Sequence, residues 1–384
     1  MNLTLPFISF FNSEKSGGLI LIICTILSLL AANIFPGSGY LEIWDDHVGG
    51  STVQHWINDG LMTIFFLLIG LELEREIYAG ELSGFRSATL PMIGALGGML
   101  IPAGLYLMVN FNSALQSGAG IPMATDIAFA VGILSLLGSR VPASLKVFLT
   151  ALAVIDDLGA ILVIAFFYTS TLVLSNLLAA IGIFCLLVIL NRLKINLLFP
   201  YLIGGVLMWY FMLHSGIHAT ITGVLLAFAI PFGDGSEKSP SYRLQHFLHR
   251  PVAFIILPLF ALANTGILLG SNWLHGLGET SSVGIFIGLI LGKPLGILLF
   301  SMAAVGLGLC ALPPELKWKH IAGAGFLGGI GFTMSIFITL LAFDNQTLIN
   351  SSKIAVLISS AIAGIIGFLW LRRTLPDKHP DQSI

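Results

Sequence analysis

The sequence predicts an all-α, polytopic membrane protein, and three observations support that fold class. Of its 384 residues, 56% are hydrophobic and only 9% are charged, whereas a soluble domain has about 25% charged residues. Apolar runs as long as membrane helices recur along the whole chain. Basic residues gather at alternate connections between these runs, as they do in membrane proteins. We therefore expect most of the outer surface to face lipid.

About twelve apolar segments are candidates for membrane helices, each of which needs roughly 20 residues. They lie at residues 17–35, 59–80, 88–109, 121–137, 144–168, 174–191, 198–212, 217–230, 247–270, 283–305, 321–343 and 352–371. The seventh and eighth segments are short, and only residues 213–216 separate them. The first segment is too long for the core of a signal peptide and lacks a strongly basic start, so we expect it to remain as a membrane helix.

The connections between these segments fall into two sets by charge. Twelve crossings place 15 of the 17 Lys and Arg residues in one set, leave Lys353 alone in the other, and put Lys293 inside a span. Because cytoplasmic loops are enriched in Lys and Arg, we expect the basic set to be cytoplasmic. This predicts a single transmembrane domain over residues 1–384, with a cytoplasmic N-terminus at 1–16, a periplasmic loop at 36–58 and a cytoplasmic tail at 372–384.

Composition gives no sign of a nucleic-acid partner or a resident cofactor. The net charge is only −2, which provides no basic surface for a polyanion. The three cysteines, Cys24, Cys185 and Cys310, lie in or beside separate apolar runs and form no CxxC motif, so we interpret them as packing residues. The nine histidines fall in loops or at span ends, and no pair has a third metal ligand nearby in sequence. Membrane lipid is the expected surrounding.

Four ionisable residues lie away from the span ends: Asp126, Asp156, Asp157 and Lys293. Each costs about 2.5–3.5 kcal/mol at the centre of a bilayer even on insertion scales, so such residues are rare and mark ion or substrate pathways. Adjacent residues on a helix point about 100° apart. The two neighbouring carboxylates are therefore expected to flank one water-filled funnel.

The aspartate pair has the chemistry of a site where cations and protons compete. Two carboxylates close together in a low dielectric cannot both ionise easily, whereas a hard cation such as Na⁺ prefers oxygen ligands. Asp156 and Asp157 can thus hold protons or a cation, but not both well. The alternative is a buried structural network with Lys293. That lysine could be a static partner of Asp156 or could carry a proton itself, because buried lysines titrate readily.

Helix-breaking residues interrupt two spans at matching places. Asp126 follows the stretch GAGIPMAT at 118–125 in the fourth span, and GGIGFT at 328–333 interrupts the eleventh. Each is the second span of a set of three, 3–5 and 10–12, and an offset of seven spans reverses the direction of the chain. The pattern predicts an inverted repeat with broken helices 4 and 11 at the binding site. Asp126 would then neutralise exposed helix N-termini and Lys293 exposed C-termini.

Seven stretches resemble the NhaA-type sodium–proton antiporters, in family order from about residue 55 onwards. They are FFLLIGLE at 65–72, IPMATDIAFA at 121–130, AVIDDLGA at 153–160, SGIHAT at 215–220, LPLFA at 257–261, GKPLG at 292–296 and GIGFTMS at 329–335. The resemblance implies a secondary active transporter, not an enzyme, that exchanges Na⁺ and Li⁺ for H⁺ electrogenically across the bacterial inner membrane. It implies broken helices 4 and 11 that cross, and a role in sodium and pH homeostasis.

The resemblance also implies roles for individual residues. Asp156 and Asp157 would be the cation- and proton-binding carboxylates, Thr125 and Asp126 would support the site, and Lys293 would be the charge partner. The family forms homodimers through a periplasmic hairpin between spans one and two, which residues 36–58 could supply. No cofactor is implied beyond the transported Na⁺, Li⁺ and H⁺.

Family members are pH-regulated, and the resemblance implies a cytoplasmic pH-response cluster here. Its candidate residues are His218, Glu72, Glu76, Arg243 and His246. The chain departs from the family pattern at Gln245, where well-studied members have an acidic residue. The acidic end of span two could be the mouth of a cation-attracting funnel, or simply a solvated helix end.

Two other function classes compete with antiport. An intramembrane aspartyl protease also needs two carboxylates that share a proton, but its two acids come from different helices, whereas Asp156 and Asp157 are adjacent. An ion channel would more naturally place rings of charge around a pore and would not need Lys293 beside the site. Proton movement coupled to a counter-transported cation separates the three classes.

Overall fold

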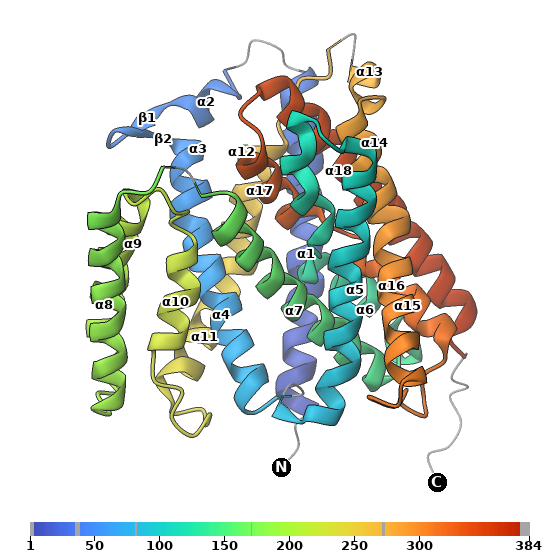
Figure 1. Ribbon diagram of the computed structural model, residues 1–384, viewed down its shortest axis with the longest axis horizontal. Coiled ribbons are helices and arrows are strands. Elements are labelled where there is room, and N and C mark those ends of the chain that lie inside the picture. Colours follow the sequence, from blue (N-terminus) through green and yellow to red (C-terminus); the bar gives the residue numbers. More distant parts are fainter. Residues whose placement is uncertain (1–3, 35–38, 81–82, 170, 271–272, 377–384) are drawn as a thin grey trace. The chain divides into compact units, whose positions relative to one another are not determined.

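The computed structural model describes residues 4–34, 39–80, 83–169, 171–270 and 273–376, without the side chains of 4–15 and 85–87. The expected ends at 1–3 and 377–384 and residues 35–38 of the first loop lie outside the described residues. The chain divides into two compact units, and Figure 1 labels their helices. Unit 1 comprises Met1–Leu19, Gly84–Asp157 and Ser271–Ile384, and unit 2 comprises Ile20–Ser83 and Leu158–Gly270.

Unit 1 contains the elements on which most of the predicted site residues lie. Its elements are the start of α1 (Thr4–Ile34), α5 (Phe85–Asn110), η3 (Ala114–Met123), α6 (Ile127–Leu136), η4 (Gly138–Arg140), the first part of α7 (Ala143–Phe167), α13 (Trp273–Leu277), α14 (Thr280–Phe286), η6 (Ile287–Gly292), α15 (Lys293–Gly306), α16 (Trp318–Gly328), α17 (Phe332–Ala342) and α18 (Gln346–Thr374). η3 and η4 are 3₁₀-helices, and η6 is a π-helical turn that runs directly into α15.

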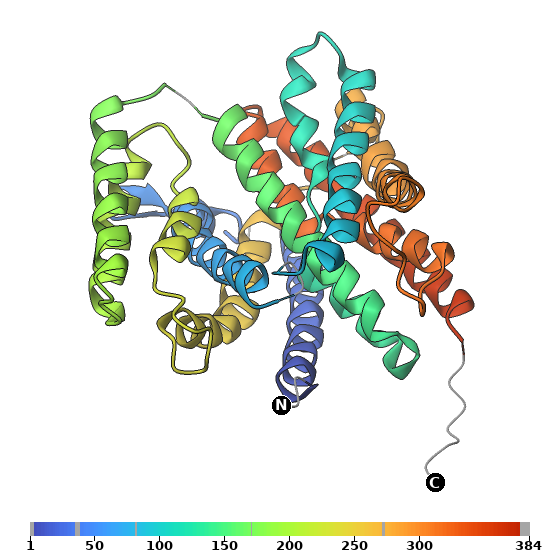
Figure 2. The ribbon, with the colours of Figure 1, turned by 60° about the horizontal axis from the view of Figure 1, so that its bottom comes forward.

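Unit 2 contains the rest of α1 and α7, the elements between α1 and α5, and the elements between α7 and α13. Its elements are α2 (Glu42–Asp45), β1 (His47–Val48), β2 (Ser51–Thr52), α3 (Val53–His55), η1 (Trp56–Leu61), α4 (Met62–Tyr78), α8 (Leu174–Arg192), α9 (Leu198–Leu213), α10 (Ile221–Ala229), α11 (Pro240–Pro251), η5 (Val252–Ile256) and α12 (Leu257–Thr265). α8 and α9 run side by side in both ribbon views (Figure 1 and Figure 2), and α10 packs against α4.

The prediction of an all-α membrane protein with about twelve spans is confirmed in its main features. Within the described residues, nine helical segments are long and apolar enough to cross a bilayer, and the pair α16 and α17, bent by 48°, makes a tenth. The shorter helices α9 and α10 occupy the positions of the seventh and eighth expected spans. Both are short because the turn at residues 214–220 divides one apolar stretch into two.

The first long connection holds a small antiparallel hairpin. His47 pairs with Thr52 and Val48 with Ser51. The two residues between the strands, Gly49 and Gly50, have φ values of 61° and 94°. Positive φ at both positions of a two-residue turn is what a tight hairpin of this twist requires, and glycine adopts it without steric cost.

Close packing of α5 against α15 positions the buried lysine of span ten. A Cβ atom on Gly296 would overlap the carbonyl oxygen of Gly97, and a Cβ on Gly97 would overlap the carbonyl oxygen of Gly296. Small residues allow membrane helices to approach at this distance. Gly98 leaves similar room, because its Cβ would lie 2.9 Å from Cγ1 of Ile297 on α15. The two glycine-rich faces therefore hold the first turn of α15 against α5.

One expectation from charge placement is wrong. Lys353 does not lie in a connection but in the third turn of α18, where only 3% of its surface is exposed. The helix begins before the apolar run does, because the side chain of Asn345 accepts hydrogen bonds from the backbone N–H groups of Thr347 and Leu348 at 2.9 and 3.2 Å. An N-cap of this kind satisfies the first free donors of a helix.

Candidate functional site

The breaks of spans four and eleven cross within unit 1, as the sequence predicts. Residues 124–126 are extended between η3 and α6, and residues 329–331 separate α16 from α17. The backbone N–H of Asp126 donates to the carbonyl of Ile330 at 2.6 Å. The hydroxyl of Ser335 donates to the carbonyl of Ile121, also at 2.6 Å. Each interrupted segment thus satisfies backbone groups that the other leaves free, which is how non-helical backbone is tolerated at membrane depth.

Asp126 joins the starts of two helices. Its Oδ2 accepts hydrogen bonds from the backbone N–H and the hydroxyl of Thr333, at 3.0 and 2.5 Å, at the start of α17. Its Oδ1 accepts from the backbone N–H of Phe129 at 3.1 Å, at the start of α6. The carboxylate therefore lies where two positive helix ends converge. Both of its oxygens accept hydrogen bonds from these donors, so the carboxylate links the starts of α6 and α17.

Lys293 and Asp156 form a fully buried ion pair beside this crossing. Nζ of Lys293 lies 2.8 Å from Oδ2 of Asp156, and both side chains are 0% exposed. Nζ also donates to the carbonyl oxygen of Met123, at the last residue of η3. Thr125 places its hydroxyl 2.6 Å from the same Oδ2 and 2.9 Å from the carbonyl oxygen of Gly328. One amine thus compensates both a carboxylate and a helix C-terminus.

The second oxygen of Asp156 is the distinctive feature of the site. Oδ1 is buried and has no hydrogen-bond partner among the described residues. A buried acceptor without a partner is unfavourable by about 1–3 kcal/mol, and more when it is charged. A proton or a hard cation at this oxygen would remove that penalty.

Asp157 follows on α7 and is only 2% exposed. Helix geometry turns it about 100° away from Asp156. The crossing and the adjoining turn of α7 thus hold three buried carboxylates, Asp126, Asp156 and Asp157, together with the amine of Lys293. Two excess negative charges cannot remain uncompensated in a low dielectric. The arrangement is chemically suited to binding protons or monovalent cations.

The candidate pH-response residues are brought together only in part. In unit 2, Nδ1 of His249 lies 3.9 Å from Oε1 of Glu72, across the contact of α4 with α11. Gln245, the position that departs from the family pattern, lies one turn before His249 on α11. Glu76 lies one turn further along α4. These residues form what we call the α4–α11 polar contact.

Sequence reasoning left His249 and Tyr242 out of this contact. The guanidinium carbon of Arg75 lies 5.2 Å from the centre of the Tyr242 ring, and that ring stacks on His246 with centroids 6.2 Å apart. The spacing of Tyr242, Gln245 and His249, three and four residues apart, could have predicted this contact, because it places all three on one face of α11. His218 lies elsewhere, between α9 and α10, where its Nε2 donates to the carbonyl of Tyr168 at 2.9 Å.

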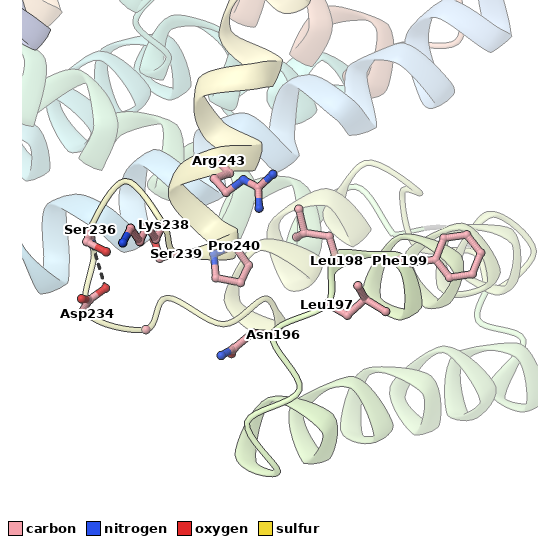
Figure 3. A pocket seen from close by; sticks show the side chains of 11 residues that line it. Asn196, Leu197, Leu198, Phe199, Asp234, Ser236, Lys238, Ser239, Pro240 and Arg243 are labelled. Atoms are coloured by element: carbon pink, nitrogen blue, oxygen red, sulfur yellow. Dashed lines mark hydrogen bonds between the residues drawn. The ribbon is translucent and has the colours of Figure 1, made fainter.

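Arg243 lines a separate pocket of about 600 Å³, shown in Figure 3. The start of α9 and the loop before α11 form its walls, with Asp234 and Lys238 among the lining residues. Hydrogen bonds from Ser236 hold the pKa of the fully exposed Asp234 below its usual value. The pocket thus combines both signs of charge, and its lining includes none of the buried carboxylates.

Comparison with known proteins places these features in a family. The family model described as Na⁺/H⁺ antiporter 1 matches residues 8–371. The chain is 66% identical over 375 residues to Na(+)/H(+) antiporter NhaA 1 of Flavobacterium johnsoniae, with 98% of each chain covered. It is 62% identical over 382 residues to Na(+)/H(+) antiporter NhaA of Cytophaga hutchinsonii, with 100% of this chain and 99% of that one covered.

A solved structure shows the same fold at low sequence identity. The sodium proton antiporter MjNhaP1 of Methanocaldococcus jannaschii at pH 8 superimposes with a TM-score of 0.57 at 16% identity, and 98% of this chain and 99% of that one are covered. The likeness supports a polytopic helical transporter fold.

Proposed function

The chain belongs to the NhaA-type family of Na⁺/H⁺ antiporters, and from this premise we propose that exchange takes place at the carboxylates of Asp156 and Asp157. The protein is a multi-pass membrane protein that exchanges sodium ions for protons. The observation that carries the proposed site is the divided environment of Asp156. One of its oxygens is held by Lys293 and Thr125, and the other is buried without a partner among the described residues.

The exchange follows from competition at these two acids. When the site opens to the side of lower proton concentration, the carboxylates release protons, and Na⁺ takes their place on oxygen ligands. The hydroxyl of Thr125 and the carboxylates of Asp156 and Asp157 are the ligands from this chain. After the site opens to the other side, protons displace the sodium ion. Because the two acids interact strongly, they titrate as one coupled system.

Lys293 sets the resting charge of this system. While the carboxylates are empty, its ammonium compensates Asp156. A sodium ion beside Asp156 repels the ammonium of Lys293. The ammonium then either shifts towards the carbonyl of Met123 or releases its proton. The ion pair and the carbonyl contact on one amine support both modes.

The finer properties of transport belong to the same proposal. We propose that exchange is electrogenic, accepts Li⁺ as well as Na⁺, depends on pH and serves sodium and pH homeostasis. The proposed pH-response residues are those of the α4–α11 polar contact, together with His218, Arg243 and His246. The protein would catalyse no covalent chemistry and bind no resident cofactor or nucleic acid.

We also propose a bacterial inner-membrane location with both termini in the cytoplasm. The basic connections support it, since Lys and Arg mark cytoplasmic loops. The β1–β2 hairpin would then be periplasmic, and its exposed strand edges could pair with a second copy to form a homodimer. Cross-linking of a cysteine introduced at Val48, which is 58% exposed, tests that contact.

Vesicles test the exchange directly. Inside-out vesicles from cells that lack other sodium antiporters carry a respiratory proton gradient, followed with a pH-sensitive dye. Addition of NaCl or LiCl should collapse the gradient, whereas KCl should not. The Asp157→Asn variant should abolish the collapse, because an amide cannot exchange a proton. Normal turnover and normal Na⁺ affinity in that variant would overturn the proposed site.

A further inference from the structure

A second lysine is buried in the same unit as the crossing and has no role in the exchange described above. Lys353 is 3% exposed in α18. Among the described residues, no carboxylate lies within ion-pair distance of its amine. A lysine buried to this degree with no ion-pairing carboxylate is expensive to keep charged. A chain that keeps such a lysine gains something from its charge.

The charged and titratable groups on the surrounding elements do not compensate Lys353. The helices and turns α6, α14, α17 and η6, all packed against α18, carry no ionisable side chain. Glu279, just before α14, binds the hydroxyl of Ser351 at 3.2 Å, about 200° around the helix from Lys353. The remaining groups on elements packed against α18 are His275 of α13 and Lys319 and His320 of α16.

The last two of these groups lie at the far end of α18. The carbonyl of Lys319 accepts from Trp370, and Nε2 of His320 lies 3.3 Å from the carbonyl oxygen of Thr374. Lys353 is about 17 residues before Trp370, which corresponds to roughly 25 Å along a helix. Neither group can therefore screen it at short range.

Lys353 faces the broken span that forms the crossing. It lies seven residues, or two helical turns, before Ser360, so both residues share one face of α18. The hydroxyl oxygen of Ser360 accepts a hydrogen bond from the backbone N–H of Phe332 at 3.1 Å, at the first residue of α17. The next residue, Thr333, binds Asp126. The Lys353 side chain therefore starts about 10 Å along the helix from a residue that contacts the crossing.

One monovalent cation can neutralise the buried charges of the unit only when Lys353 is counted. Among the described residues of unit 1, the buried acidic and basic side chains (histidine aside) are Asp126, Asp156, Asp157, Lys293 and Lys353. Fully ionised, this set carries one net negative charge, which one monovalent cation neutralises. Without Lys353 it carries two.

We propose that Lys353 sets the charge of the exchange site, so that its ammonium weakens the binding of Na⁺ and of protons at the carboxylates and allows one cation to neutralise the set. This inference rests on the proposed exchange site at Asp156 and Asp157. Lys353 acts at a distance through its field and touches neither ion, so it is a positioning residue. A low-dielectric interior transmits such a field further than water does.

The Lys353→Met variant should change ion affinity more than turnover. In a medium of effective dielectric about 20, a unit charge that lies more than roughly 12 Å away changes the binding of a second charge by up to about tenfold. Loss of the positive charge should therefore lower the Na⁺ KM by up to about tenfold at neutral pH, where a lysine amine is protonated. Protons would be held more tightly as well, so the pH of half-maximal activity should move towards alkaline by about one unit.

The test uses three variants of the full-length protein in the inside-out vesicles. Lys353→Met and Lys353→Gln remove the charge, and Lys353→Arg keeps it. Removal of an uncompensated buried charge does not destabilise the fold, which melting of the purified protein checks. We expect both neutral variants to show the lower KM and the alkaline shift, and the arginine variant to match the parent.

Two outcomes would overturn the inference. Neutral variants with the KM and pH profile of the parent would show that the charge of Lys353 does not reach the site. An equal shift in Lys353→Arg would show that the shape of the side chain matters and its charge does not. A failure of the proposed exchange site itself appears separately, as exchange that survives in Asp157→Asn.

Discussion

The amine of Lys293 lies 2.8 Å from Oδ2 of Asp156, and both side chains are completely buried. The other oxygen of the same carboxylate, Oδ1, has no hydrogen-bond partner among the described residues. The carboxylate is thus ion-paired without being saturated. Oδ1 therefore remains open to a proton or a sodium ion while Oδ2 is held by Lys293 and Thr125.

Removal of the amine alone should destabilise the protein. The Lys293→Met variant leaves Asp156 buried without its counter-charge and removes the donor to the carbonyl of Met123. Breaking a buried ion pair from one side costs about 3–5 kcal/mol. We expect a large fall in melting temperature and a lower Na⁺ concentration for half-maximal rate, because no ammonium then repels Na⁺ from the carboxylates.

The double variant Lys293→Met with Asp156→Asn is the matched control. It removes both charges, so most of the lost stability should return, while exchange remains impaired. If Lys293→Met matched the parent in stability and Na⁺ requirement, Lys293 would have no part in the mechanism.

The hydroxyl of Thr333 should contribute to the crossing. It donates to Oδ2 of Asp126 at 2.5 Å, beside the backbone donor of the same residue. The Thr333→Val variant keeps the shape and removes this donor, so we expect a loss of about 1–3 kcal/mol in stability. Thr333→Ser retains the hydroxyl and should lie close to the parent in thermal melts. Equal melting temperatures for all three proteins would mean that Asp126 does not depend on this contact.

Close approach of α5 and α15 should be indispensable for the position of Lys293. In Gly296→Ala the new methyl group would overlap the carbonyl oxygen of Gly97, so the helices must separate and the first turn of α15 must move. We expect exchange to be lost and the free energy of unfolding to fall by several kcal/mol. The overlap is with a backbone atom, so no change of side-chain rotamer can relieve it.

Gly104→Ala, on the partner helix α5, is the control. Nothing lies within 4 Å of a Cβ at that position, and alanine favours the helix by about 1 kcal/mol over glycine. That variant should therefore be as stable and active as the parent. A Gly296→Ala protein that melts and transports like Gly104→Ala would contradict the tight contact.

The α4–α11 polar contact should shift the pH dependence of exchange and leave its maximum rate unchanged. Glu72 and His249 attract each other only when the histidine is protonated, which happens near neutral pH for ordinary histidines. We expect Glu72→Gln to move the pH of half-maximal activity by about half a unit or more. The control Glu237→Gln, in the exposed loop before α11, should leave the pH of half-maximal activity unchanged. If the pH profiles of both variants superimpose on that of the parent, the α4–α11 polar contact has no part in the pH response.

Much of the fold follows from the sequence because the membrane imposes simple rules. A span needs a long apolar run, so hydropathy locates it, and the stretches IPMATD at 121–126 and GGIGF at 328–332 reveal breaks because they interrupt such runs. The acids of the site stand out for the same reason, since nothing about packing explains Asp156 and Asp157 in an apolar helix.

The remaining contacts of the site could not be predicted, because they involve backbone groups that every residue has. The partners of Lys293 and Thr125 at the crossing include the carbonyls of Met123 and Gly328, and every residue has a carbonyl. Lys353 was misplaced because the polar first turns of α18, with Ser351 and Ser352, resemble a loop in composition although they are buried. The contact of Glu72 with His249 joins residues far apart in sequence, which no local pattern reports.

The measurement that tests the central claim most directly is the affinity of the purified protein for Na⁺ as a function of pH, by titration calorimetry. If Na⁺ and protons compete for Asp156 and Asp157, the dissociation constant must fall as pH rises, by up to tenfold per pH unit for each proton displaced. Binding must also release protons into the buffer, and Asp157→Asn must lose both effects. A dissociation constant that is independent of pH, with no proton release, would contradict competition at these carboxylates.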